Sequence, residues 1–213
     1  MPDPAKIIRV DPVSPDKKTV QTAGKILHQD GLVIFPAACM YGVAANALST
    51  KAIEKVFTLK QRPKDKAILV LVPGPESVLD FAASIPETAR KLMAAFWPGK
   101  LTLVFKAKND LPKALTAGTG KIGIRQPGHP VALKLVQTAG LLLTGTSANL
   151  SGQDNCTTVG QLPKKIIEQS NLILDAGTLK GGSGSTIVDV TTEPVTILRQ
   201  GRVSTAQIMA ALL

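Results

Sequence analysis

Short apolar runs of strand length alternate along the chain with segments whose apolar residues recur at helical spacing. The short apolar runs predict buried strands, and apolar residues three or four positions apart predict helices. The reason is that side chains return to the same face every two residues in a strand and every 3.6 residues in a helix. The predicted strands are 6–10, 32–35, 67–72, 101–105, 121–125, 141–144, 171–175, 186–190 and 195–199. The predicted helices cover 15–30, 50–62, 76–83, 86–96, 130–138, 162–169 and a last segment capped by Ser204.

Capping and breaking residues mark the ends of the first two helices. Ser14-Pro15 places a hydroxyl cap before a proline at the first helical position, and Gly31 ends this helix. Ser49 or Thr50 caps the second helix. It must end before Pro63, because proline disfavours helical geometry in the residue ahead of it.

This alternation predicts one α/β domain over residues 1–213, without repeats or a clear linker. Hydrophobic residues make up 44% of the 213 residues, enough for a sizeable core. The fully apolar strands 67–72 and 141–144 are typical of a sheet covered on both faces. Strands 186–190 and 195–199 follow one another with no helix between them, so we expect a mixed sheet.

The charge is unevenly distributed. The net charge is +10, and the segment from Arg90 to Lys134 holds nine basic residues against one acid. Such a field attracts nucleotides, RNA or acidic lipid, although a basic surface kept for solubility explains it equally well. Aromatic residues make up only 3%, which argues against proteins that bind nucleic acid by stacking bases.

Several functional classes are excluded or disfavoured by what the sequence lacks. The apolar runs are much shorter than the ~18 residues typical of a membrane span, and no signal peptide is visible, so we expect a cytoplasmic protein. Cys39 and Cys156 are too few for a disulfide framework, and His28 and His129 form no zinc-ligand spacing. We expect His28 to be a surface residue rather than a catalytic base. The GxGxxG match at 118–123 precedes a predicted strand instead of a helix, which argues against a dinucleotide site.

Three polar clusters lie next to predicted strands or helix ends, where α/β folds place ligand sites. Lys60 and Arg62 can clamp a phosphate, or simply favour the dipole at the end of their helix. The segment 144–152 offers small hydroxyls, an amide and glycines that let a ligand approach the backbone; an ordinary turn is the alternative. The glycine-rich segment 181–186, paired with Arg199 beyond the next strand, reads by itself as a flexible loop.

Taken in order, these clusters and their neighbours resemble the YrdC/TsaC family of threonylcarbamoyl-AMP synthases over residues 21–203. The matching motifs are Lys60-x-Arg62-Pro63, Trp97-Pro98-Gly99-x-Leu101-Thr102, Arg125-x-Pro127-x-His129-Pro130, Thr146-Ser147-Ala148-Asn149-x-Ser151-Gly152, Ser185-Thr186-x-Val188-Asp189 and Leu198-Arg199-x-Gly201. The resemblance implies a single-domain twisted mixed sheet, flanked by helices, around a basic concave groove, in the short bacterial form.

The resemblance also implies an activity and a set of site residues. The family joins L-threonine, bicarbonate and ATP into L-threonylcarbamoyladenylate and pyrophosphate, with Mg²⁺ carried on ATP, and partner proteins then modify tRNA. The implied catalytic and ATP-binding residues are Lys60, Arg62, Ser147 and Asn149, with Arg199 also binding ATP. The implied substrate-binding residues are Cys39, Arg125 and Ser185.

One motif departs from the family pattern. The family turn Pro-Thr-Glu-Thr-x-Tyr-Gly is here Pro36-Ala37-Ala38-Cys39-Met40-Tyr41-Gly42, which replaces three polar residues with small, mostly apolar ones. Cys39 is either a reactive thiol or a small core residue. The departure leaves two alternatives open beside the synthase. One is a non-catalytic relative that binds double-stranded RNA, tRNA or ribosomal RNA by shape and phosphate contacts. The other is an ATP-dependent enzyme with a different small acceptor.

Overall fold

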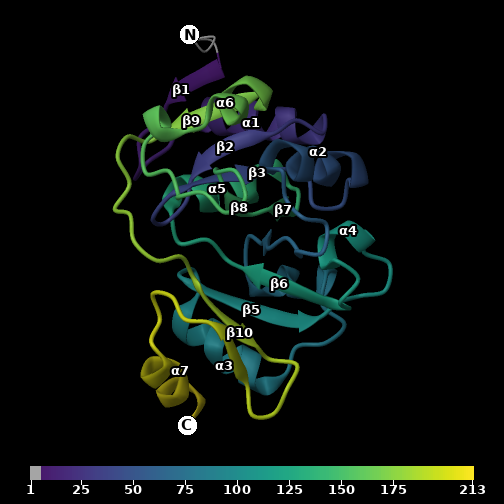
Figure 1. The fold of residues 1–213 in the computed structure, drawn as a ribbon. Helices are drawn as coiled ribbons and strands as arrows, with labels where there is room; N and C mark the ends of the chain where they lie inside the picture. Colours follow the sequence, from purple (N-terminus) through teal and green to yellow (C-terminus); the bar gives the residue numbers. More distant parts are fainter. Residues whose placement is uncertain (1–5) are drawn as a thin grey trace.

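The strands form two mixed sheets, which Figure 1 shows in the upper and lower halves of the molecule. The structure is a computed structural model and describes residues 6–213. The upper sheet has the order β1-β9-β2-β3-β8, with bounds Ile7–Arg9, Leu172–Asp175, Val33–Pro36, Tyr41–Ala44 and Thr146–Ser147. The lower sheet has the order β11-β10-β5-β6-β4-β7, with bounds Thr196–Arg199, Thr186–Asp189, Leu101–Lys106, Lys121–Arg125, Val70–Leu71 and Leu143–Thr144.

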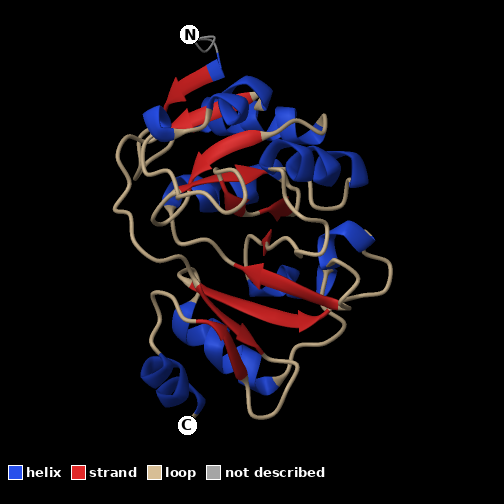
Figure 2. Ribbon diagram, in the orientation of Figure 1, coloured by secondary structure: helices blue, strands red, loops and turns tan. Residues whose placement is uncertain are grey.

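Helices cover both sheets (Figure 2). The α-helices are α1 (Lys17–His28), α2 (Thr50–Lys60), α3 (Glu87–Phe96), α4 (Lys113–Thr116), α5 (Pro130–Ala139), α6 (Lys164–Gln169) and α7 (Thr205–Leu212), and the 3₁₀ helices are η2 (Pro75–Asp80) and η3 (Val159–Gln161). Helices α1 and α5 pack together against the upper sheet, where Leu27 and Leu135 bury apolar side chains with Phe35. Helices α3 and α7 contact each other beside the lower sheet.

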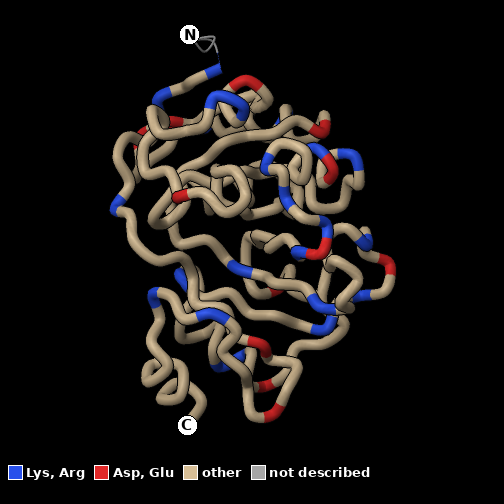
Figure 3. Tube along the Cα trace, in the orientation of Figure 1, with Lys and Arg blue, Asp and Glu red and all other residues tan. Residues whose placement is uncertain are grey.

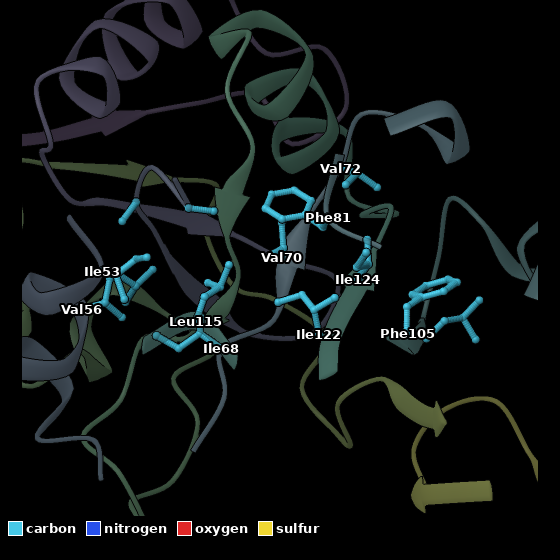
Figure 4. Close-up of a cluster of buried hydrophobic side chains, with 14 of the residues drawn as sticks. Ile53, Val56, Ile68, Val70, Val72, Phe81, Phe105, Leu115, Ile122 and Ile124 are labelled. Carbon is cyan, nitrogen blue, oxygen red and sulfur yellow. The ribbon is translucent and has the colours of Figure 1, made fainter. Parts of the chain in front are cut away.

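A single large apolar core joins the two sheets. It contains Ile34 and Val43 from the upper sheet and Val70, Ile122 and Ile124 from the lower one, all fully buried. Figure 4 shows the lower-sheet members of this core beside the α2 side chains. The two sheets are therefore held together by one apolar core.

The predicted α/β class and mixed pairing are confirmed, with differences in detail. The strands divide between two sheets, and β3 was not predicted. The apolar run 67–72 forms ladder pairs only at Val70–Leu71, and the helix predicted at 76–83 is the 3₁₀ helix η2. The predicted cap Ser14 is wrong: Asp16 caps α1 by accepting from Thr19 N at 2.9 Å, while Ser14 N donates to Asp11.

Two further predictions are confirmed. His28 is exposed at the end of α1, with its Nε2 2.8 Å from the main-chain oxygen of Ala139. The strand β6 begins inside the GxGxxG match, so this segment does not lead into a helix. Within residues 6–213, no helix has both the length and the apolar character required to cross a bilayer.

Candidate functional site

A cavity of about 540 Å³ lies between the two sheets. Its wall includes the turn before β3 and strand β8 on one side, and parts of β5, β6 and β11 on the other. Six of the eight predicted site residues line it: Cys39, Arg62, Arg125, Ser147, Ser185 and Arg199. Residues from positions 39 to 199 of the sequence thus meet at one place, which spacing alone did not establish.

Lys60 and Asn149 lie behind this wall. Helix α2 ends where Gln61 adopts a left-handed conformation, and this places Lys60 as its last residue, 1% exposed. The Lys60 Nζ donates to the main-chain oxygens of Ser147 and, at 2.7 Å, Asn149, and to Asn149 Oδ1 at 3.0 Å. Lys60 therefore anchors the 147–149 segment through its ammonium group. Direct contact of Lys60 or Asn149 with a phosphate stays a prediction.

The anchored segment presents Ser147 to the cavity. Ser147 pairs with Gly42 across the β3–β8 ladder, and its Oγ donates to Asn149 Oδ1 at 2.5 Å. Asn149 Nδ2 in turn donates to the main-chain oxygen of Gln153 at 2.5 Å. Because each hydrogen bond fixes the next group, the Ser147 hydroxyl has a defined direction before any ligand arrives.

The environment of Lys60 changes its acidity. Burial, aided by the nearby positive charge of Arg62, lowers the pKa of Lys60 to about 8, and Cys156 opposes this weakly. Arg62 itself is held by donation from Nε to the main-chain oxygen of Lys66 at 3.1 Å and from Nη2 to that of Ala67 at 2.7 Å. Burial lowers the pKa of Arg62 as well, so both cations here gain from an approaching anion.

The opposite wall carries two more arginines. Arg199 donates from Nη2 to the main-chain oxygen of Ser185 at 2.8 Å and to its Oγ at 3.3 Å. The Ser185 hydroxyl also lies 2.8 Å from Thr102 Oγ1, which fixes it against β5. Arg125 projects from β6, and its buried Nε has no hydrogen-bond partner among the residues that the structure describes.

Arg125 is the least satisfied cation of the site. Burial lowers the pKa of Arg125 to about 10, with a further lowering by the charge of Arg199 and an opposing contribution from Cys39. A buried cation beside a second cation is costly unless an anion joins them. The pair therefore indicates a site for a phosphate or carboxylate.

Some lining residues were not predicted from the sequence. Lys100, Thr102, Lys121 and Asn155 also line the cavity, and Lys121 Nζ is paired with Asp189 at 2.7 Å. For Lys100 and Lys121 the basic segment from Arg90 to Lys134 was the available signal, and Figure 3 shows lysines and arginines at the level of β5 and β6. Over the described residues, 6–213, no three His, Cys, Asp or Glu side chains are grouped to hold a metal ion.

Comparisons with known proteins agree with this geometry. The model of the Sua5/YciO/YrdC family, described as telomere recombination, matches residues 25–201. The threonylcarbamoyl-AMP synthase of Pyrococcus abyssi is 33% identical over 182 residues, covering 85% of this chain and 54% of that protein. The synthase of Bacillus subtilis is 34% identical over 203 residues, covering 95% and 59%. This chain thus spans a little over half the length of these two relatives.

Solved structures of members of this family are also similar to this chain. Pyrococcus abyssi Sua5 complexed with L-threonine superposes with a TM-score of 0.89 at 31% identity, covering 96% of this chain and 60% of that one. Escherichia coli YciO shares the fold, with a TM-score of 0.80 at 22% identity over 94% of this chain and 96% of that chain. With a family match over most of its length, this chain belongs to the Sua5/YciO/YrdC family.

Proposed function

We propose that this chain is a threonylcarbamoyl-AMP synthase, which forms L-threonylcarbamoyladenylate and pyrophosphate from L-threonine, bicarbonate and ATP. The relatives above carry this name, and one was solved with L-threonine bound. The observation that carries the proposal is the cavity itself, where Arg62 and Ser147 on one wall face Arg125, Ser185 and Arg199 on the other. Such a site suits a substrate with several negatively charged groups.

The reaction needs positioning and charge more than acid–base groups. The amine of threonine adds to bicarbonate, which gives a carbamate and water. A carbamate oxygen then bonds to the α-phosphorus of ATP as the bond to the bridging oxygen breaks and pyrophosphate leaves. Negative charge develops on the phosphoryl oxygens, and preorganised cations such as Arg62 and Arg199 stabilise it. Ser147 and Ser185 orient the reactants, and Lys60 acts as a positioning residue behind Ser147.

Magnesium is proposed to enter with ATP rather than to be held by a protein cage. Mg²⁺ prefers oxygen ligands and is commonly bound through substrate phosphates, whose charge it neutralises. The cations Arg62 and Arg199 and the hydroxyls of Ser147 and Ser185 at the cavity suit the phosphates that would carry the ion. We also propose a cytoplasmic setting in which partner proteins transfer the threonylcarbamoyl group to tRNA.

The test is pyrophosphate release with ATP, Mg²⁺ and bicarbonate, measured with and without threonine, followed by mass spectrometry of the adenylate. Threonine-dependent release and the mass of threonylcarbamoyl-AMP are expected, and omission of bicarbonate is the control. If ATP binds but no amino acid elicits release, the synthase proposal is wrong. Salt-dependent binding of duplex RNA by such an inactive protein would then favour the RNA-binding alternative.

The pH dependence of ATP binding gives a second test. We expect ATP affinity to fall by about three- to tenfold as the pH rises through about 8, because Lys60 then loses its positive charge and one donor. The sign follows from a lowered lysine pKa: the charged form is present below pH 8 and is lost above it. Titration calorimetry from about pH 7 to 9.5 measures this. In Lys60→Arg the step should vanish, whereas an unchanged step would assign it to another group.

A further inference from the structure

One wall of the cavity carries no strong hydrogen-bonding side chain. Ala37, Ala38, Cys39 and Met40 all line the cavity, in the turn between β2 and β3. Two of these side chains are methyl groups, and the thiol and thioether of the others are weak partners. A ligand group placed against this turn therefore meets an apolar surface.

Part of the main chain of the turn is engaged within the protein. Ala37 N donates to the main-chain oxygen of Met40 at 3.0 Å, and Cys39 O accepts from Gly181 N at 3.0 Å. Tyr41 N donates to the main-chain oxygen of Cys156 at 2.8 Å. These groups are not available to replace the missing side-chain partners.

Arg125 lies beside this apolar turn. Cys39 and Arg125 both line the first cavity, and the buried Nε of Arg125 has no partner within residues 6–213. An anionic group can bind at Arg125 while the rest of the same small molecule rests against the turn. An α-amino acid has this combination, with a carboxylate at one end and a side chain at the other.

A second cavity adjoins the turn. This cavity of about 370 Å³ shares Ala38 and Lys100 with the first, and is otherwise lined by Ala95, Phe96, Trp97, Pro98, Gly99, Gly128 and Val203. Its side chains are mainly apolar, so the surface beyond Ala38 is of the same chemical kind. A ligand side chain that rests against this turn therefore meets a mainly apolar surface.

We propose that the acceptor subsite, taken as part of the proposed synthase, binds the carboxylate of an α-amino acid and a small apolar side chain without recognising the threonine hydroxyl. Valine, which has a methyl group where threonine has its hydroxyl, is then an acceptor at least as good as threonine. Its amine forms a carbamate with bicarbonate, releasing water. A carbamate oxygen bonds to the α-phosphorus of ATP, and pyrophosphate leaves.

The preference between valine and threonine distinguishes a pocket that binds the threonine hydroxyl from an apolar pocket. A site built to bind a hydroxyl rejects the analogue without it by about 10⁴- to 10⁵-fold, because its own polar groups are left unpaired. An apolar pocket distinguishes valine from threonine by only about 10²-fold, in favour of valine. We therefore expect a valine-to-threonine ratio of kcat/KM between about 1 and 100.

The experiment measures pyrophosphate release with threonine, valine, 2-aminobutyrate and serine in turn, and identifies each adenylate by mass. A valine-to-threonine ratio below about 1 overturns the inference, even where threonine turnover supports the synthase. Absence of release with every amino acid overturns the proposed function itself, and the inference with it. A ratio of about 1 or more, with the mass of the valine adenylate, supports both.

A matched pair of variants locates the effect at the turn. Cys39→Thr adds a hydroxyl and a methyl group, whereas Cys39→Val adds the same shape without the hydroxyl. We expect Cys39→Thr to shift the valine-to-threonine ratio toward threonine by about tenfold, which is the effect of one added hydrogen bond. We expect Cys39→Val to leave the ratio unchanged, because the pocket stays apolar. Because the ratio is measured within one preparation, partial loss of folded protein cancels. Equal ratios in the two variants would contradict the role of the turn.

Discussion

Lys60→Met is expected to lower kcat/KM for adenylate formation by about 10²-fold or more, because the 147–149 segment loses its anchor and Ser147 moves. The change removes the donor to the part-buried main-chain oxygen of Ser147 and the buried one of Asn149, and one of the two donors to Asn149 Oδ1. Buried acceptors without a donor cost about 1–3 kcal/mol each, so the free energy of unfolding should fall by about 3 kcal/mol. Pyrophosphate release and calorimetric melting measure the two effects.

The control for this variant is Lys51→Met, which removes the same charge from an exposed position on the same helix. It should alter neither quantity appreciably. Because lost activity alone does not separate a positioning role from general damage, the pH profile is the added readout. Residual ATP binding by Lys60→Met should lack the step near pH 8. A variant that keeps full activity would show that the anchor is dispensable.

Arg125→Met is expected to lower the rate of turnover by about 10²- to 10³-fold and to make the ligand-free protein more stable. Arg125 is partly buried, with its Nε shielded from solvent, and both burial and the charge of Arg199 lower its pKa to about 10. Its Nε has no partner within the described chain, 6–213, so an apolar side chain of similar length removes an uncompensated cost. A gain of about 1 kcal/mol corresponds to a rise of about 2–4 °C in Tm.

Calorimetry with and without ATP and threonine distinguishes this outcome from simple unfolding. ATP and threonine together should raise the Tm of the unmodified protein more than that of the variant, since binding to the folded state stabilises by mass action. Lys108→Met, which removes an exposed charge beyond β5, is the control and should change neither Tm nor turnover appreciably. A fall in Tm in Arg125→Met would contradict the stored cost that we assign to this arginine.

The sequence predicted most elements, because apolar periodicity reports burial directly. Strands β5 and β6 and helices α2 and α5 lie within a residue or two of their predicted bounds. The division into two sheets was not predictable, since the pattern shows which residues are buried but not which strand pairs with which. The run 67–72 illustrates the limit: it is apolar throughout, yet only Val70–Leu71 has neighbours in register.

The sequence predicted which residues belong to the candidate site better than it predicted what each residue does there. Arg62, Arg125 and Arg199 do meet at one cavity. The burial of Lys60 could not be predicted, because a lysine at a helix end is normally exposed to solvent. Only the tertiary contacts of its ammonium group show otherwise. The position of Asn149 behind Ser147 depends on the same contacts. Both follow from the approach of two segments almost ninety residues apart, which no local pattern encodes.

The order β1-β9-β2 in the upper sheet has a consequence for synthesis of the chain on the ribosome. Strand β9 lies between β1 and β2, so Ile7 pairs with Ile173 and Ile34 with the same residue. Most of the chain must leave the ribosome before the two N-terminal strands have their common neighbour. Contacts of this sequence separation slow folding, because the loop must close before its contacts stabilise it. The cavity is lined by residues as far along the chain as Arg199, so it forms only after β9, β10 and β11 have been synthesised. Nascent chains that end before β9 carry exposed strand edges for chaperones to bind.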